Sequence, residues 1–129
     1  MSSSQRHQTA PSSPEEFFAG SPTGLAICRA VQAMVEGLGG GTEMRVSKSQ
    51  VAFRRRRGFA YVWRPDRYLK SDVPAVLSLA TDHPIASQRF KEVVHPSPRV
   101  WMHHLELRDP TEVDSEVEQW LRLCAAAAA

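Results

Sequence analysis

The chain has 129 residues and a mass of 14.4 kDa, with 42% hydrophobic and 23% charged residues, so one domain with an ordinary buried core is expected. Its two cysteines, Cys28 and Cys124, are too few for a disulfide scaffold, and no apolar run approaches the roughly 20 residues that span a bilayer. We therefore expect a soluble cytoplasmic protein with reduced thiols and no membrane partner.

The small net charge of +2 conceals an uneven distribution. Residues 44–70 carry nine basic side chains and one acidic side chain, a local charge of +8 that leaves −6 on the rest of the chain. Four of the basic residues, Arg54 to Arg57, are consecutive. Residues 109–118 carry five acidic side chains and no basic one, so a neighbour within the same protein could neutralise part of the positive field.

The first residues are polar, rich in Ser and Gln, and without periodic apolar positions, so burial cannot offset the entropy lost on ordering them. We predict a disordered tail over residues 1–12, a single domain over residues 13–124 and an alanine tail over residues 125–129. The domain opens with a capping pattern in which a proline follows the N-cap Ser13 and Glu16 occupies the third helical position.

A second cap at Ser21-Pro22 predicts the main N-terminal helix, which we expect to run to Leu38. Apolar residues recur along it with the three-and-four spacing of one helix face. These are Ile27, Val31, Met34, Val35 and Leu38. The glycines at positions 39–41 predict the end of the helix, because glycine readily takes the left-handed conformation found there.

Residues 43–47 alternate as a first strand, and a hairpin is predicted beyond it. The first hairpin strand carries Val51 and Phe53 and the second carries Phe59, Tyr61 and Trp63, with four arginines and Gly58 between them. The length of the loop decides which of these residues share a face of the sheet.

A two-residue turn at Arg57 and Gly58 would place Tyr61 and Trp63 on the face opposite Phe53. A three-residue loop over residues 56–58 instead pairs Phe53 with Tyr61 and Val51 with Trp63, so that every large apolar residue lies on one side. We predict the three-residue loop, with Gly58 at positive φ. The two aromatic residues are then expected on the buried face.

Three further segments predict strands, namely residues 74–80, residues 89–95 as a short strand, and residues 99–108. The last of them alternates, with Trp101, His103, Leu105 and Leu107 on one face. The order of elements predicts an α+β fold, in which an antiparallel sheet of about four to five strands is flanked by N- and C-terminal helices.

The sequence DPTE at residues 109–112 combines an N-cap aspartate, a proline and a glutamate at the third position, and predicts that the C-terminal helix starts there. One apolar stripe follows, formed by Val113, Val117, Trp120, Leu121 and Cys124. We expect this helix to pack on the sheet face that carries Phe53, Tyr61, Trp101 and Leu105.

No catalytic residue, metal ligand or cofactor is assigned from the sequence. His103 and His104 are adjacent on a predicted strand and therefore point to opposite faces, so they cannot both bind one metal ion in the usual way. No nucleophile elbow, P-loop or dinucleotide-binding glycine motif occurs.

Several segments together resemble a bacterial domain of unknown function. They are EEFFAG with the helix that follows it, RVSKSQVAFRRRRGFAYVW, KEVVHPSPRVWMHHLEL and DPTEVDSEVEQWLRL, and the resemblance covers residues 15–124. That domain occurs alone in small actinobacterial proteins and is appended to so-called predicted transport proteins. The resemblance implies an α+β fold with an antiparallel sheet flanked by terminal helices, and it implies no activity, substrate or catalytic residue.

The leading functional hypothesis is a nonenzymatic binding or interaction domain that contacts an anionic partner through its basic hairpin, because guanidinium groups pair with phosphate oxygens. The partner would be a nucleic acid or other polyanion, or else a protein. Aromatic stacking on bases would require an open sheet surface. The candidate ligand-binding residues are Lys48, Arg54, Arg55, Arg56, Arg57 and Arg64.

Two alternatives remain open. One is a small enzyme with a His/Lys site on the segment from Lys91 to His104, in which His95 and His103 are further candidates. The other is a self-associating structural module.

Overall fold

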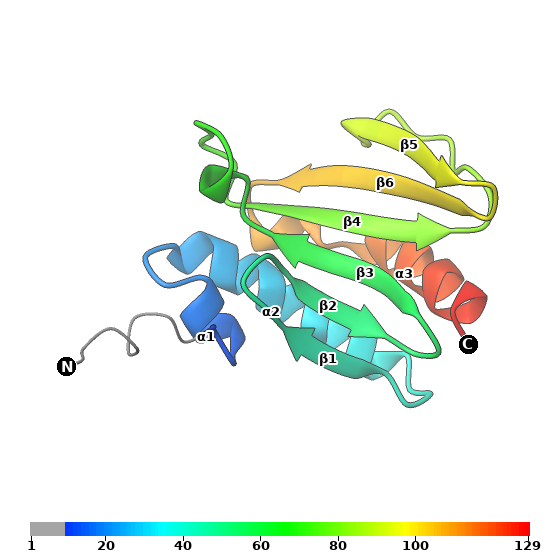
Figure 1. The fold of residues 1–129 in the computed structure, drawn as a ribbon, viewed down its shortest axis with the longest axis horizontal. Helices are drawn as coiled ribbons and strands as arrows, with labels where there is room; N and C mark the ends of the chain where they lie inside the picture. Colours follow the sequence, from blue (N-terminus) through cyan, green and yellow to red (C-terminus); the bar gives the residue numbers. More distant parts are fainter. Residues whose placement is uncertain (1–9) are drawn as a thin grey trace.

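Six antiparallel strands form one sheet in the order β1-β2-β3-β4-β6-β5 (Figure 1). The computed structural model describes residues 10–129, so the predicted tail over residues 1–12 lies largely outside it. The strands are β1 (Glu43–Val46), β2 (Val51–Arg54), β3 (Gly58–Trp63), β4 (Ala75–Thr81), β5 (Glu92–Ser97) and β6 (Val100–Leu107). The predicted α+β class is confirmed, and the sheet has six strands where about four to five were expected.

The helices are α1 (Pro14–Phe17), α2 (Pro22–Gly37) and α3 (Ser115–Ala127), with the short 3-10 turns η2 (Pro65–Arg67) and η3 (Pro110–Glu112). Ser13 and Ser21 cap α1 and α2 as predicted, each accepting a hydrogen bond from a backbone N–H three residues on. The glycines at positions 39–41 all have positive φ, between 70° and 82°, and α2 ends just before them. No helix of residues 10–129 is long and apolar enough to cross a bilayer.

The start of the C-terminal helix differs from the prediction. Asp109 caps only η3, by accepting a 2.9 Å hydrogen bond from the backbone N–H of Thr111. The backbone of Val113 then leaves the helical region, at φ −83° and ψ 83°. A second cap is therefore needed, and Asp114 provides it by accepting a 3.1 Å hydrogen bond from Val117 N. The alanine run that we set apart from the domain continues α3 to Ala127.

Helices α2 and α3 lie side by side on one face of the sheet (Figure 1). The stripes predicted for both helices face the sheet: Val31 of α2 and Val117 and Leu121 of α3 are fully buried. Phe53, Leu77 and Leu105 meet them from the strands. The opposite face, turned toward the viewer in Figure 1, carries no helix of the described chain. That uncovered face is where polar and aromatic side chains can form a site.

The predicted hairpin register is wrong. Phe53 pairs with Ala60, and the pairing shifts at a bulge between Phe53 and Arg54. The irregularity lets the consecutive residues Phe59 and Ala60 both become buried, which reverses the alternation for the rest of β3. Tyr61 and Trp63 therefore lie on the uncovered face and not on the face packed against the helices.

The conformation of Gly58 also differs from the prediction, because its φ is not positive. Instead, the phenol of Tyr61 lies against Gly58, and an added Cβ atom would come within 2.8 Å of Tyr61 Cζ. A side chain at this position would displace the phenol of Tyr61 from where it lies. This close approach follows from the turn of Tyr61 onto the outer face.

Candidate functional site

A groove of about 370 Å³ lies on the uncovered face of the sheet, above strands β3, β4 and β6. Its aromatic and thioether lining comes from Tyr61, Trp63, Tyr68 and Met102, and its polar lining comes from Ser49, Gln50, Ser78 and His104. The antiparallel register creates this cluster, because Tyr61, Ser78 and His104 occupy directly opposed positions on three neighbouring strands.

A chain of two hydrogen bonds crosses the base of the groove. The indole N–H of Trp63 donates to Ser78 Oγ over 2.9 Å, and Ser78 Oγ is 2.7 Å from Nδ1 of His104. Ser78 is only 4% exposed, so its hydroxyl group depends on these protein partners. The arrangement holds the indole and imidazole rings in fixed positions relative to the sheet.

Aromatic edges define the walls of the groove. The ring of Trp63 meets Tyr68 at 6.1 Å between centroids and His104 at 6.4 Å, both in edge-to-face geometry. Tyr68 is 60% exposed and stands beyond β3, just after η2. Burial raises the pKa of Tyr61, and the positive charge of Arg54 partly opposes this shift. The aromatic rings that line the groove can therefore contact a ligand while the core stays folded.

A second hollow of about 210 Å³ adjoins the groove at one end of the sheet, next to Ala127 and Ala128 at the end of α3. Tyr61 and Met102 line both hollows, and Arg57 and Arg99 line the second one. At the other end, Ser49 and Gln50 belong to the β1–β2 turn, which also contains Lys48. Cationic residues therefore occur at both ends of an aromatic surface.

The structure gives several of the predicted ligand-binding arginines protein partners. Arg55 donates a 2.7 Å hydrogen bond to Gly39 O and a 3.1 Å bond to Thr42 Oγ1. Arg57 donates to Ala127 O over 2.9 Å. Arg54 lies 4.0 Å from Glu43 and donates to Arg56 O over 3.4 Å. The side chain of Arg56 is exposed and forms no ion pair within residues 10–129.

The six predicted residues are not brought together. Lys48 lies in the β1–β2 turn and the arginine run lies in the β2–β3 turn, at opposite ends of β2. Arg64 is only 8% exposed; it donates to Phe17 O and Ala19 O and forms a two-pronged contact with Asp66 at 3.0 and 3.1 Å. Arg64 thereby fastens α1 to the end of β3.

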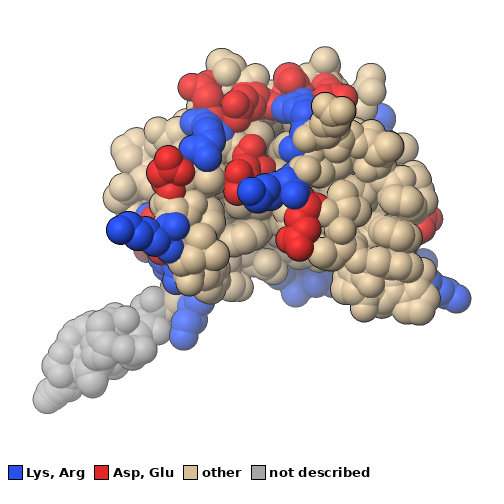
Figure 2. Space-filling view, turned by 90° about the horizontal axis from the view of Figure 1, so that it is seen from above, with Lys and Arg blue, Asp and Glu red and all other residues tan. Residues whose placement is uncertain are grey.

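The acidic run at residues 109–118 does not neutralise the arginine turn. Arg89 pairs with Asp114 at 3.1 Å and with Glu116 at 2.7 Å, at the N-terminal end of α3, whereas the arginine turn contacts the C-terminal end of the same helix. Arg89 also donates a 3.0 Å hydrogen bond to Glu112 O, so it ties its loop to the start of α3. Acidic and basic side chains are interspersed on the side seen in Figure 2, with no broad patch of one sign.

The two adjacent histidines face opposite sides, as predicted. His103 is fully buried, donates through Nδ1 to Leu79 O over 3.1 Å and accepts through Nε2 from Ile85 N over 2.9 Å. Its pKa is lowered from the ordinary value, chiefly because burial penalises the charged ring. His95 stacks on Trp101 at 3.8 Å. Within residues 10–129, no three His, Cys, Asp or Glu side chains gather as a metal site would require.

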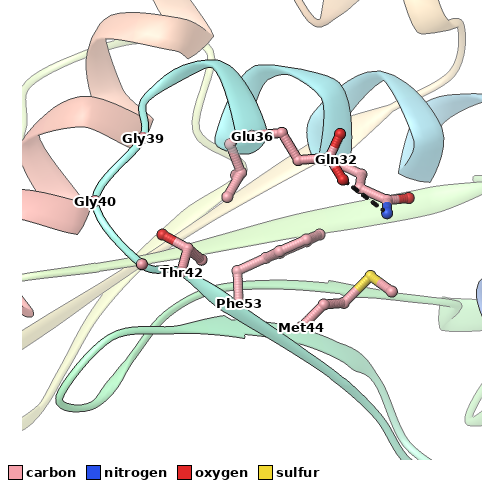
Figure 3. Close-up of a pocket in the computed structure, with 9 residues that line it drawn as sticks. Gln32, Glu36, Gly39, Gly40, Thr42, Met44 and Phe53 are labelled. Carbon is pink, nitrogen blue, oxygen red and sulfur yellow. Dashed lines mark hydrogen bonds between the residues drawn. The ribbon is translucent and has the colours of Figure 1, made fainter.

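A separate pocket of about 270 Å³ lies between α2 and β1 (Figure 3). Gln32 and Glu36 project from the helix, and Met44 and Phe53 rise from the strands below. The carboxylate of Glu36 already accepts a 3.3 Å hydrogen bond from Gln32. This pocket offers an apolar floor and few free polar groups, so the groove on the open face is the stronger candidate.

Sequence reasoning missed Ser78 and the outward placement of Tyr61 and Trp63. Ser78 lies in the apolar segment PAVLSLA and belongs to no motif. The only available signal was the alternation of β6, which placed His104 on the polar face. The partner across the strand could be identified only once the register was known.

The fold and the groove define a two-layer α+β domain with one open sheet face. The chain belongs to the family described as domain of unknown function DUF5655, which it matches over residues 15–127. No curated protein and no solved structure matches the chain.

Proposed function

We propose that this protein is a nonenzymatic binding domain whose partner is a single-stranded nucleic acid laid across the uncovered face of the sheet. One observation carries the proposal: Tyr61 and Trp63 lie on that face and line its groove. Aromatic side chains on an open antiparallel sheet are a recurrent platform for stacking unpaired bases. The reversed hairpin register thus supplies the open surface that base stacking requires.

The distribution of positive charge supports the same partner. Lys48 lies beside the groove at the β1–β2 turn, and Arg99 lines its extension at the other end. Neither residue forms an ion pair within the described part of the chain. An extended polyanion has repeated phosphates that can contact the cations at both ends of the groove. A small ligand in the groove would contact the cation at one end only.

Other cations on this face contribute less because they already have partners. Glu43 lies 3.3 Å from Arg45 and 4.0 Å from Arg54 on the same side of the sheet. Arg57 contacts the end of α3. The contact surface that we propose therefore moves from Lys48 with the arginine hairpin to the aromatic groove with Lys48 and Arg99. The two buried free thiols support the expected cytoplasmic location, because reduced cysteines persist there.

The test is fluorescence anisotropy with a labelled single-stranded oligonucleotide and its duplex, at about 50 and 200 mM salt. We expect the single strand to bind more tightly than the duplex, because a duplex hides its base faces. Tyr68→Ala should weaken single-strand binding by about 1–3 kcal/mol, the usual contribution of one stacked base. Tyr68 suits this test because its exposure spares the core.

The charge contribution is tested with Lys48→Ser combined with Arg99→Ser. Each phosphate contact on a single strand adds about 0.7 to the magnitude of the slope of log K against log salt. The slope measured for the double variant should therefore be smaller in magnitude by about 1.4. Arg122→Ser is the matched control, because Arg122 is exposed on α3, on the opposite side of the sheet. Absence of binding at the lower salt, or equal binding of strand and duplex, would refute the proposal. Light scattering on the same samples tests the self-associating alternative.

A second candidate function rests on the 2.7 Å contact between Ser78 Oγ and His104 Nδ1. A serine hydroxyl bonded to a histidine is the pairing that activates a nucleophile for acyl transfer. Ser78 is nearly inaccessible, and its oxygen also accepts from Trp63, so a substrate carbonyl has little access to it. Labelling with a fluorophosphonate probe decides the matter: modification that is lost in Ser78→Ala would favour the enzyme.

A further inference from the structure

The hydrogen-bond chain at the base of the groove determines which groove atoms can recognise a ligand. The indole N–H of Trp63 can only donate, so Ser78 Oγ accepts that bond. Ser78 has one hydroxyl proton, and the structure offers one further neighbour for it, His104 Nδ1 at 2.7 Å. The consistent assignment is that Ser78 donates to Nδ1 and Nδ1 accepts.

The opposite assignment has an energetic penalty. If Nδ1 carried the proton and donated to Ser78, the serine oxygen would accept two bonds and its own proton would have no acceptor among residues 10–129. An unsatisfied donor at a residue that is only 4% exposed costs about 1–3 kcal/mol. The neutral imidazole of His104 therefore carries its proton on Nε2.

The Nε2 atom of His104 is left available to a ligand. His104 lines the groove, and within the described residues Nε2 has no protein hydrogen-bond partner. The nearest opposed position on β5 is Glu92, and Glu106 follows two residues along β6 on the same face. Trp63 lies beside the imidazole at 6.4 Å, so a ring stacked against the indole places its edge within reach of this donor.

We infer that Trp63 and Ser78 hold His104 as a hydrogen-bond donor and that its Nε2–H donates to an acceptor oxygen or nitrogen on the edge of the bound base. This inference rests on the proposed function, since it names the chemistry of the base bound at that site. His104 contacts the base, while Ser78 and the indole nitrogen of Trp63 are positioning residues. Their role is to set the tautomer of the imidazole.

The first test needs no ligand. Long-range proton–nitrogen NMR of the full chain at about pH 8, where an unperturbed histidine is neutral, reports which ring nitrogen carries the proton. We expect Nε2–H for His104, assigned by comparison with His104→Gln. Ser78→Ala and Trp63→Phe should each yield a tautomer mixture, and Ser78→Thr, which keeps the hydroxyl, should restore Nε2–H. His95 stacks on Trp101 and takes no part in the hydrogen bonds of Ser78, so it is the internal control. Its tautomer should be the same in all variants.

The second test measures recognition of the acceptor. Oligothymidine is compared with the same oligomer carrying difluorotoluene, which keeps the shape of thymine and lacks its carbonyl oxygens. The wild-type protein should prefer thymine by roughly two- to tenfold, the range expected for one neutral hydrogen bond. The preference should vanish in His104→Phe, which keeps a ring and removes the donor.

The outcomes separate the two proposals. Failure of the wild-type protein to bind oligothymidine refutes the nucleic-acid function and with it this ligand class. Binding with equal affinity for thymine and difluorotoluene overturns only the hydrogen bond from His104 to the base. An Nδ1–H tautomer in the wild-type spectrum overturns the inference about His104 whether or not an oligonucleotide binds.

Discussion

The guanidinium group of Arg57 donates a 2.9 Å hydrogen bond to the carbonyl oxygen of Ala127, in the last turn of α3. The backbone N–H of Arg56 donates to Ala128 O, also over 2.9 Å. Carbonyl groups at a helix C-terminus have no partner within the helix and concentrate partial negative charge. The basic turn between β2 and β3 thus caps a helix that lies some 70 residues further along the chain.

The capping contact predicts different effects for two neighbouring arginines. Arg57→Ser should lower the free energy of unfolding by about 0.5–1 kcal/mol, since it removes a charged donor from an exposed helix end. Arg56→Ser should have little effect, because Arg56 makes its contact through the backbone. Urea midpoints of the two variants measure the difference. Equal midpoints would show that the guanidinium of Arg57 contributes nothing to the cap.

Trp120 fastens α3 to the segment beside β5. It is 6% exposed, its ring lies 4.6 Å from that of Phe90, and the guanidinium of Arg89 sits over it at 5.4 Å. We expect Trp120→Ala to cost about 3–5 kcal/mol, as for other large buried aromatic residues. Leu123→Ala on the same helix is the control, because Leu123 is exposed. Thermal or urea unfolding should separate the two; similar curves would mean that α3 packs only loosely.

The contact between Gly58 and Tyr61 predicts a coupled pair of substitutions. Gly58→Ala should destabilise the protein by about 1–3 kcal/mol, because the new methyl group collides with the phenol ring. Tyr61→Phe removes the hydroxyl and should recover part of that loss, so the two changes should not be additive. A double-mutant cycle of unfolding free energies measures the coupling. Additive effects would point to a backbone requirement at Gly58 instead.

His103 should make stability depend on pH. Burial lowers its pKa in the folded protein below the ordinary 6.5, with His83 and His104 adding to the shift, so the unfolded chain binds a proton before the folded one does. Stability is therefore complete above about pH 6.5 and falls as the pH drops below it. The unfolding free energy, measured between about pH 7.5 and 5, should decline less steeply in His103→Gln. An equally steep decline in His103→Gln would show that other groups cause the pH dependence.

The elements of this fold and most of their faces follow from local sequence patterns. Ser13 and Ser21 mark helix starts because a short polar side chain can accept from the free N–H groups of the first turn. The apolar stripe of α3 and the alternation of β6 predicted which residues are buried, since these periods follow directly from helix and strand geometry. Capping and periodicity are properties of short segments, so they can be recognised in the sequence.

The register of the hairpin, and the site built on it, depend on contacts between distant parts of the chain. One bulge beside Phe53 reverses which residues of β3 point to the buried face. Side chains along a strand point alternately to its two faces, so a shift of one residue moves each of them to the other face. The contact between Ser78 and His104 depends on pairing between β4 and β6, which are separated by β5 in the chain. The carbonyl partners of Arg57 and Arg64, which belong to Ala127, Phe17 and Ala19, are likewise distant in sequence. Such contacts arise when whole elements pack together, so the spacing of residues within one element does not predict them.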